Sequence, residues 1–222
     1  DAVVEGLRYR ADNVSRIGLL GMEMANTATL EHISDYLLDS GCALSFSSLR
    51  ADRINDKLYD LLSQSDLKSV AIAPDGASER LRRVINKGLD ASDLLTGATR
   101  LVEAGIFKLK IYVMVGLPTE TCEDLQEFID LITQIKENID NIGRQRGRLS
   151  EIYLSVNCFV PKPWTPFQFH PFGISKQLQP GQTLSMKEAV STLKEKISYL
   201  KNGVRALSNV HLQADKPENA FF

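Results

Sequence analysis

An α/β fold with parallel strands is predicted by two features of this sequence. Short, continuous apolar runs of strand length alternate with amphipathic stretches of helix length along most of the chain. Several of the apolar runs, such as 69–73 and 111–117, are continuous, which is typical of parallel strands covered by helices on at least one face. Such strands are joined by right-handed crossovers. This pattern leaves open whether the sheet curves into a barrel or is doubly wound.

The apolar runs predict five strands and a shorter sixth, at residues 15–21, 43–49, 69–73, 108–116, 151–160 and 208–213. Helices are expected at 29–41, around 58–62, at 79–87 and 92–103, from 121 and from 186. Ser185 and Glu188 have the spacing of a capping box, which marks the start of the last helix. The third strand is expected to stop at Pro74, and the basic segment 141–150 to be a solvated loop.

Composition indicates one cytoplasmic domain with a sizeable core. The chain has 222 residues, 43% of them hydrophobic, and a net charge of −2, so nucleic acid and anionic membranes are not expected as main partners. The longest apolar run, 111–117, is too short to span a bilayer, and the first residues do not have the pattern expected of a signal peptide. Cys42, Cys122 and Cys158 are widely spaced, which suits a reducing compartment.

Polar residues follow almost every predicted strand. The strand ends read "GMEMAN", "SSLRAD", "APDGASE", "GLPTET" and "NCFVPKPWTP". In parallel α/β folds the loops after the strands meet at the carboxyl edge of the sheet, where ligands bind. The sequence therefore predicts a binding site at that edge.

Three stretches resemble motifs of the radical S-adenosylmethionine (radical SAM) superfamily. They are "APDGASERLRRVINKG", "GLPTET" and "FVPKPWTPFQ", each at a predicted strand end and in the order that the family shows. The chain most resembles the iron-sulfur oxidoreductases of this superfamily that often carry a cobalamin-binding domain. The resemblance extends from about residue 15 to the end of the chain.

This resemblance implies a partial (β/α)6 TIM-like barrel, here mainly its strands two to six with their helices. Members of the family hold a [4Fe-4S] cluster through a CxxxCxxC loop and cleave SAM reductively to a 5'-deoxyadenosyl radical. The CxxxCxxC sequence is absent from these residues. We expect it just before Asp1, so that residues 1–222 form a radical SAM core truncated at the cluster loop and at its C-terminus. This chain alone is then expected to be inactive, with no metal ligands of its own.

The resemblance also implies contacts to SAM at the first two strand ends. Gly21, Met22 and Glu23 stand in the place of a GGE-like motif that holds the methionine amino group. Ser48 and Arg50 match positions that contact the SAM carboxylate or ribose.

Further contacts are implied in the turn and helix after the third strand. Asp75 matches a residue placed against the ribose, and Lys87 a basic residue aimed at the SAM carboxylate. Ser78 lies in the same turn and is a third candidate. Asp75 and Ser78 are explained as well by helix capping, and capping is favoured for Ser78. The arginines of "ERLRR" are expected on a solvated helix face.

The last implied contacts belong to the adenosine pocket. Tyr112 and the backbone around Gly116 are expected to line it, with Asn157 and Phe159 beside the adenine. Trp164 and Phe169, in the proline-rich stretch that follows, either close a core or line a substrate opening.

The function predicted is that of the SAM-binding core of a radical SAM enzyme with an unidentified small-molecule or macromolecular substrate. A flavodoxin or ferredoxin is implied as the electron donor, and cobalamin as a further cofactor held by a separate domain. Two alternatives stay open. One is a barrel without a cluster that binds a nucleotide or a protein; the other is an enzyme of the phosphate-sugar barrel kind.

Overall fold

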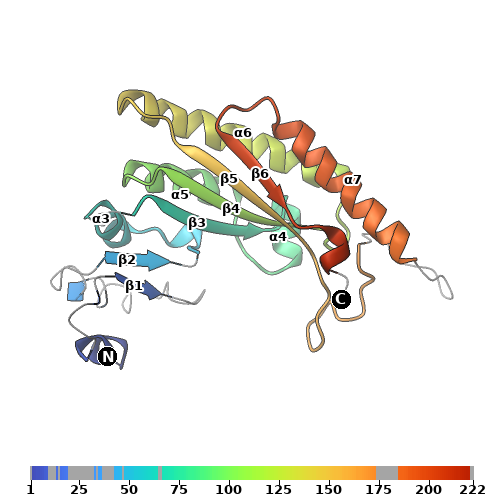
Figure 1. Ribbon diagram of the computed structural model, residues 1–222, viewed down its shortest axis with the longest axis horizontal. Helices are drawn as coiled ribbons and strands as arrows, with labels where there is room; N and C mark the ends of the chain where they lie inside the picture. Colours follow the sequence, from blue (N-terminus) through green and yellow to red (C-terminus); the bar gives the residue numbers. More distant parts are fainter. Residues whose placement is uncertain are drawn as a thin grey trace.

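The computed structural model describes residues 2–9, 14, 16–19, 33, 35–36, 43–46, 48–64, 67–173 and 185–220. In this part of the chain, parallel strands form a curved sheet with helices along one face (Figure 1). The strands are β1 (Arg16–Leu19), β2 (Ala43–Phe46), β3 (Ser69–Asp75), β4 (Lys108–Val115), β5 (Glu151–Cys158) and β6 (Val210–Ala214). The helices are α1 (Ala2–Arg8), α3 (Asp56–Gln64), α4 (Glu79–Val84), α5 (Ala91–Glu103), α6 (Cys122–Gln145) and α7 (Met186–Val204), with short 3-10 turns η1 (Ala51–Arg53) and η2 (Pro217–Ala220).

The strands follow one another in chain order across the sheet. β3, β4, β5 and β6 pair in parallel, and β1 and β2 form a second parallel pair. Leu49 joins the pair β1–β2 to the four strands β3–β6. It forms a parallel bridge to Ile72, and its N–H donates to the carbonyl of Ala71 at 2.7 Å. Among the described residues β1 and β6 do not pair, so the sheet is an open, partial barrel, as expected.

Alternate residues of β4 separate the two faces of this sheet. Leu109, Ile111 and Val115 are buried on the face that the helices cover. Lys110 and Tyr112 lie on the opposite, inner face. The core beneath the helices is completed by apolar side chains of β5, α5, α6 and α7, namely Ile152, Leu154, Val156, Leu94, Leu101, Phe128, Ile132, Leu193 and Leu200.

The predicted elements agree with the observed ones where the structure describes them. Leu58, Leu61 and Leu62 are buried on α3, and the capping box at Ser185 is present. The short sixth strand is β6, parallel to β5. The helix predicted at 29–41 lies almost wholly outside the described residues.

Several predicted boundaries are wrong. α4 ends at Val84 and not at 87, and β5 ends at Cys158 and not at 160. β3 does not stop at Pro74 but continues to Asp75, because an irregularity in its register between Ile72 and Asp75 accommodates the proline, which has no N–H to donate. α6 continues to Gln145, through half of the segment expected to be a loop.

The basic residues of that segment have structural partners. The guanidinium of Arg146 donates to the carbonyls of Val102 and Glu103 at the carboxyl end of α5, where a positive charge is favourable. Arg148 lies over the ring of Phe107, 3.6 Å from its centroid. These contacts attach the end of α6 to α5.

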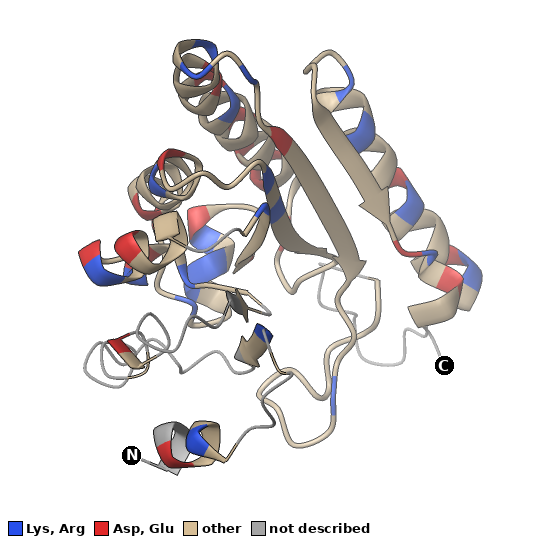
Figure 2. Ribbon diagram, turned by 60° about the vertical axis from the view of Figure 1, so that its left-hand side comes forward, with Lys and Arg blue, Asp and Glu red and all other residues tan. Residues whose placement is uncertain are grey.

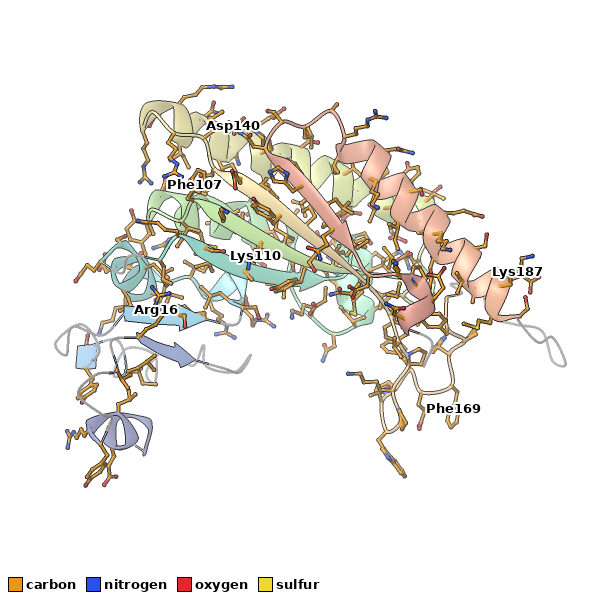
Figure 3. All side chains as sticks on the ribbon, viewed as in Figure 1. Arg16, Phe107, Lys110, Asp140, Phe169 and Lys187 are labelled. Atoms are coloured by element: carbon orange, nitrogen blue, oxygen red, sulfur yellow. The ribbon has the colours of Figure 1, made fainter. Side chains whose placement is uncertain are left out.

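Charged residues of both signs are interspersed along the helices, whereas most of the strand surface is uncharged (Figure 2). The loop after β5 projects away from the sheet and carries Phe169 (Figure 3). Trp164 and Phe169 are 95% and 91% exposed, so they do not close a core. None of the helices described here is long and apolar enough to cross a membrane.

Candidate functional site

The carboxyl ends of β3, β4 and β5 lie at one edge of the sheet. Asp75, the last residue of β3, pairs with Val113 of β4. The N–H of Phe159, just after β5, donates to the carbonyl of Val115 at 2.9 Å. Because the strands are parallel, the loops that follow them start side by side at this edge.

A cluster of three charged residues, Arg50, Asp75 and Lys87, lies at this edge. The ammonium of Lys87 donates to Asp75 Oδ2 at 2.6 Å, and the guanidinium of Arg50 donates to the carbonyl of Lys87 at 3.1 Å. Arg50 also forms an ion pair with Asp52 at 3.0 Å. The Lys87 side chain is 7% exposed, whereas that of Asp75 is 28% exposed. The structure therefore brings together three residues that were predicted separately, and leaves one carboxylate of the cluster accessible.

Turns in the backbone before and after α4 bring Asp75 and Lys87 together. Asp75 has a φ of 62°, a left-handed conformation that aspartate tolerates better than most residues. It turns the chain from β3 into the loop before α4, and Lys87 follows α4, where Asn86 and Gly88 also have positive φ. The ion pair therefore closes the loop and helix between residues 75 and 87 onto the strand end.

Arg82 braces the same loop from inside. Its side chain is fully buried, its Nε donates to the carbonyl of Leu89 at 2.7 Å, and one terminal nitrogen is within 3.4 Å of the carbonyls of Gly76 and Ala77. Burial lowers the pKa of Arg82 below its ordinary value, although acidic side chains around it oppose that shift. The expectation of a solvated face is therefore wrong for Arg82.

Arg80 and Arg83 of the same helix differ from each other. Arg80 forms an ion pair with Asp124 and donates to the carbonyl of Thr119 at 2.8 Å, in the turn after β4. Arg83 pairs with Glu79 on its own helix, and its side chain is 75% exposed, whereas that of Arg80 is 49% exposed. A solvated position is thus confirmed for Arg80 and Arg83.

Asp124 connects the loops that follow β3 and β4. It accepts hydrogen bonds from Ser78 Oγ, from the Arg80 guanidinium and from the N–H of Thr121, the last at 2.7 Å. Ser78 Oγ also accepts from the N–H of Leu81 at 3.1 Å, so the capping interpretation of Ser78 is confirmed. Ser78 is fully buried, and its hydroxyl both donates to Asp124 and accepts from Leu81. We therefore do not retain it as a cofactor contact.

The turn after β4 is held by a buried carboxylate. Glu120 Oε1 accepts from the N–H of Gly116 at 3.0 Å and from the ammonium of Lys196 of α7 at 2.6 Å. Gly116 has a φ of 84°. A Cβ placed on Gly116 would lie 2.7 Å from Leu193 Cδ2, so this turn is packed directly against α7.

Replacing Gly116 with alanine is expected to lower the free energy of unfolding by about 1–2 kcal/mol more than the same change at Gly147. Both glycines have positive φ, but a Cβ at Gly147 would meet no atom within 4 Å. The difference between the two variants in urea unfolding therefore measures mainly the contact with Leu193. Equal losses of unfolding free energy in the two variants would show that Leu193 of α7 moves aside without a measurable cost.

The remaining predicted contacts are placed as follows. Tyr112 and Asn157 lie half-buried on the inner face of the sheet, and Phe159 packs edge-to-face against Phe167 with centroids 5.8 Å apart. Ser48 is half-buried next to Leu49, at the end of β2. Gly21, Met22 and Glu23 lie outside the described residues.

The described cysteines do not form a metal site. Cys122 is exposed at the start of α6, and Cys158 is buried at the end of β5. Burial raises the pKa of the Cys158 thiol to about 11, with a further contribution from Asp215 and Glu218, so it is a poor thiolate donor at neutral pH. Among the described residues no three His, Cys, Asp or Glu side chains could hold one metal ion. These residues therefore do not fit an iron-sulfur cluster.

One residue at the sheet edge fits a polar part of SAM. The accessible carboxylate of Asp75 suits ribose hydroxyls, and the turn at Gly116 lies after the neighbouring strand. The Lys87 ammonium is 7% exposed and donates to Asp75 Oδ2, so it holds that carboxylate in place. Fold and edge together define a parallel α/β partial barrel with a ligand site beyond its strands.

The chain belongs to the radical SAM superfamily. The family model for that superfamily matches residues 8–132, more than half of the sequence. Its members use SAM and a [4Fe-4S] cluster, so the family indicates an enzyme with these cofactors. Membership argues against the phosphate-sugar barrel that the strand pattern alone left open.

A relative of this chain in sequence is known. The uncharacterized protein MJ0966 of Methanocaldococcus jannaschii is 33% identical over 168 residues, which are 76% of this chain and 35% of that protein. This chain therefore spans about a third of the length of that relative.

Two solved structures share the fold. SuiB of Streptococcus suis, in its structure bound to SAM, has a TM-score of 0.54 and 12% identity over 93% of this chain and 41% of that one. Coproporphyrinogen III oxidase (HemN) of Escherichia coli, described as a radical SAM enzyme, has a TM-score of 0.53 and 15% identity over 85% of this chain and 41% of that one.

Four structural residues of the site were not singled out from the sequence. They are Arg82, Glu120, Asp124 and Lys196. Arg82 follows the apolar Leu81 in a basic run, which gave no signal of burial. Lys196 meets Glu120 from a distant helix, and no local pattern could have indicated that pair.

Proposed function

We propose that this chain is the SAM-binding core of a radical SAM enzyme, and that the carboxyl edge of its sheet holds the cofactor. The observation that carries the proposal is the cluster of Arg50, Asp75 and Lys87 at the strand ends of a chain that belongs to this superfamily. Reductive cleavage of SAM supplies the chemistry by which such an enzyme abstracts hydrogen from its substrate.

Each residue of the edge has a separate task in this proposal. Asp75 accepts hydrogen bonds from the ribose hydroxyls through its accessible carboxylate, and Lys87 holds that carboxylate in its orientation through the ion pair. The turn at Gly116 supports the adenosine, and Tyr112, Asn157 and Phe159 line the inner face beside it. Gly21, Met22, Glu23 and Ser48 stay in the proposal as contacts implied by the resemblance.

The described residues provide neither the ligands of the [4Fe-4S] cluster nor the electron donor. We expect the cysteine ligands in another part of the protein, a flavodoxin or ferredoxin as the reductant, and a cobalamin domain as a possible addition. SuiB has been solved with the precursor peptide SuiA bound, whereas HemN is a coproporphyrinogen III oxidase, so proteins of this fold bind very different molecules. The fold therefore supports the chemistry without indicating the substrate.

The proposal is tested in the full-length protein, purified without oxygen. Under strong reductant it should bind SAM and release 5'-deoxyadenosine. SAM binding without 5'-deoxyadenosine would favour the alternative of a binding module, and absence of SAM binding by the folded protein would overturn the proposal.

The variant Asp75→Asn is expected to weaken SAM binding by about ten- to a hundredfold, since loss of a charge-assisted hydrogen bond costs about 1.5–3 kcal/mol. Asparagine is chosen because, unlike alanine, it tolerates the left-handed φ of 62° at this position. Calorimetric titration with SAM measures the affinity, and a thermal melt measures stability. The exposed Asp60→Asn on α3 is the matched control. If affinity holds while stability falls, Asp75 serves the fold and not the cofactor.

A further inference from the structure

A cavity of about 350 Å³ lies on the inner face of the sheet, across β4, β5 and β6. The proposed SAM edge does not include it, apart from Tyr112. Its polar lining consists of Lys110, Tyr112, Tyr153, Ser155, His211 and Gln213. Figure 3 shows Lys110 in the middle of the sheet, on the strand β4.

The strand register places these side chains in two adjacent rows. Lys110, Tyr153 and His211 are direct neighbours across β4, β5 and β6, and the rings of Tyr153 and His211 are 4.8 Å apart. Tyr112, Ser155 and Gln213 form the next row towards the carboxyl edge. A parallel sheet fixes these Cα neighbours through its backbone hydrogen bonds, so the side chains start side by side on one face without a ligand.

The lining donates hydrogen bonds and carries no carboxylate. None of the residues that line the cavity is Asp or Glu. The nearest acid in the register, Glu151, is engaged at the amino end of the strands, where it accepts from the Tyr153 hydroxyl at 2.8 Å and lies 3.8 Å from Lys108 Nζ. In the described part of the chain, Lys110 has no carboxylate partner within ion-pair distance.

We propose that this cavity binds an oxyanion, a carboxylate or a phosphate, carried by the substrate of the enzyme. The Lys110 ammonium supplies the positive charge, and the imidazole of His211, the hydroxyls of Tyr112 and Ser155 and the amide of Gln213 can donate hydrogen bonds to the oxygens. This inference rests on the proposed function, because it treats the inner face as the substrate side of the barrel.

The position of the cavity limits the shape of such a substrate. β4 has 8 residues, and a strand rises about 3.3 Å per residue. Lys110, near the amino end of β4, is therefore on the order of 20 Å from the turn at Gly116. The anionic group would lie remote from the carbon that reacts at the carboxyl edge, so the substrate is expected to be elongated.

Anion binding can be tested without SAM and without a cluster. The 222-residue chain is titrated with inorganic phosphate and, separately, with succinate, while the ring-proton NMR signals of its three histidines are followed. The variant His211→Gln assigns the signal of His211. We expect a saturable shift of that signal with at least one of the two anions, and none with glycerol. The stronger response distinguishes a phosphate site from a carboxylate site.

The variant Lys110→Met is expected to weaken that binding by about tenfold or more, because a charge-assisted hydrogen bond is lost. Lys201→Met, an exposed lysine on α7, should leave it unchanged. Circular dichroism checks that both variants are folded. The inference is overturned if neither anion shifts the His211 signal of the folded protein, or if Lys110→Met binds as tightly as the parent.

Failure of this inference is distinguishable from failure of the proposed function. Anion binding at the cavity together with no SAM binding by the full-length protein would overturn the proposed function alone. Intact SAM cleavage with an unresponsive His211 would overturn the oxyanion site alone.

Discussion

Replacing Arg82 with methionine is expected to lower the free energy of unfolding by about 3 kcal/mol or more, the largest loss foreseen for any single side chain of the site. Methionine fills much of the same volume but donates no hydrogen bond. The carbonyl of Leu89 would lose a partner at 2.7 Å, and those of Gly76 and Ala77 would lose weaker ones, all in a buried setting. Unsatisfied buried carbonyls cost about 1–3 kcal/mol each.

The matched control is Arg83→Met, one residue further along α4. Arg83 is largely exposed and pairs only with Glu79, so its loss should change stability by less than about 0.5 kcal/mol. Urea unfolding of the two variants gives the comparison. Similar stabilities would mean that water or rearranged backbone replaces the guanidinium, and that Arg82 does not brace the loop.

The same variant should affect the cofactor site. The loop that Arg82 holds carries Asp75 at one end and Lys87 at the other. If the loop loosens, the ion pair loses its fixed geometry, and SAM affinity should fall together with stability. Arg82 is thus a positioning residue. The variant Arg82→Lys keeps the positive charge and much of the length, so its SAM affinity and its stability should both lie between those of the parent and of Arg82→Met.

The second large effect is expected for Asp124→Asn, which should cost about 2–3 kcal/mol at neutral pH. Asp124 is 4% exposed and accepts hydrogen bonds from Ser78, Arg80 and Thr121, so asparagine must turn its NH₂ group towards one of these donors. The variant also leaves Arg80 without its carboxylate partner.

The loss at Asp124 is expected to depend on pH. Burial by itself raises the pKa of Asp124, but the hydrogen bonds from Arg80, Ser78 and Thr121 outweigh burial and leave the pKa below its ordinary value. A carboxyl with a lowered pKa stabilises the folded state above its unfolded pKa of about 3.9, and this stability is lost as the pH falls further. The difference between parent and variant should therefore be full at pH 7 and shrink below about pH 4.

Unfolding in urea at several pH values measures this difference. Glu137→Gln, at an exposed position of α6, is the control and should show little change at any pH. A difference that stays constant from pH 7 to pH 3 would mean that Asp124 acts through its shape and not through its charge.

Local sequence patterns were sufficient for most elements and for the edge at which the site lies. Periodicity indicated α3, α5 and α7, and the capping chemistry of Ser78 and Ser185 was readable because a cap and its partner are only three residues apart. The polar residue Asp75 after a buried strand correctly indicated the carboxyl edge of the sheet.

The pattern failed where a side chain finds its partner far along the chain. The arginine-rich run around Arg82 indicated a solvated face, but the guanidinium is buried against the carbonyls of Gly76, Ala77 and Leu89. The basic segment after residue 140 indicated a loop, but contacts of Arg146 with the end of α5 allow α6 to continue. Neither partner is visible in the local sequence.

By itself, then, the sequence determined a parallel α/β chain with its ligand edge after the strands, because apolar periodicity and turn chemistry act over a few residues. Only the tertiary structure decided which charges meet: Asp75 with Lys87, Asp124 with Arg80, and Glu120 with Lys196. It also decided that Lys110 and His211, a hundred positions apart in the sequence, share one row of the sheet. Strand pairing and helix packing set these neighbours, because backbone hydrogen bonds and buried apolar area depend on how distant segments are placed in space.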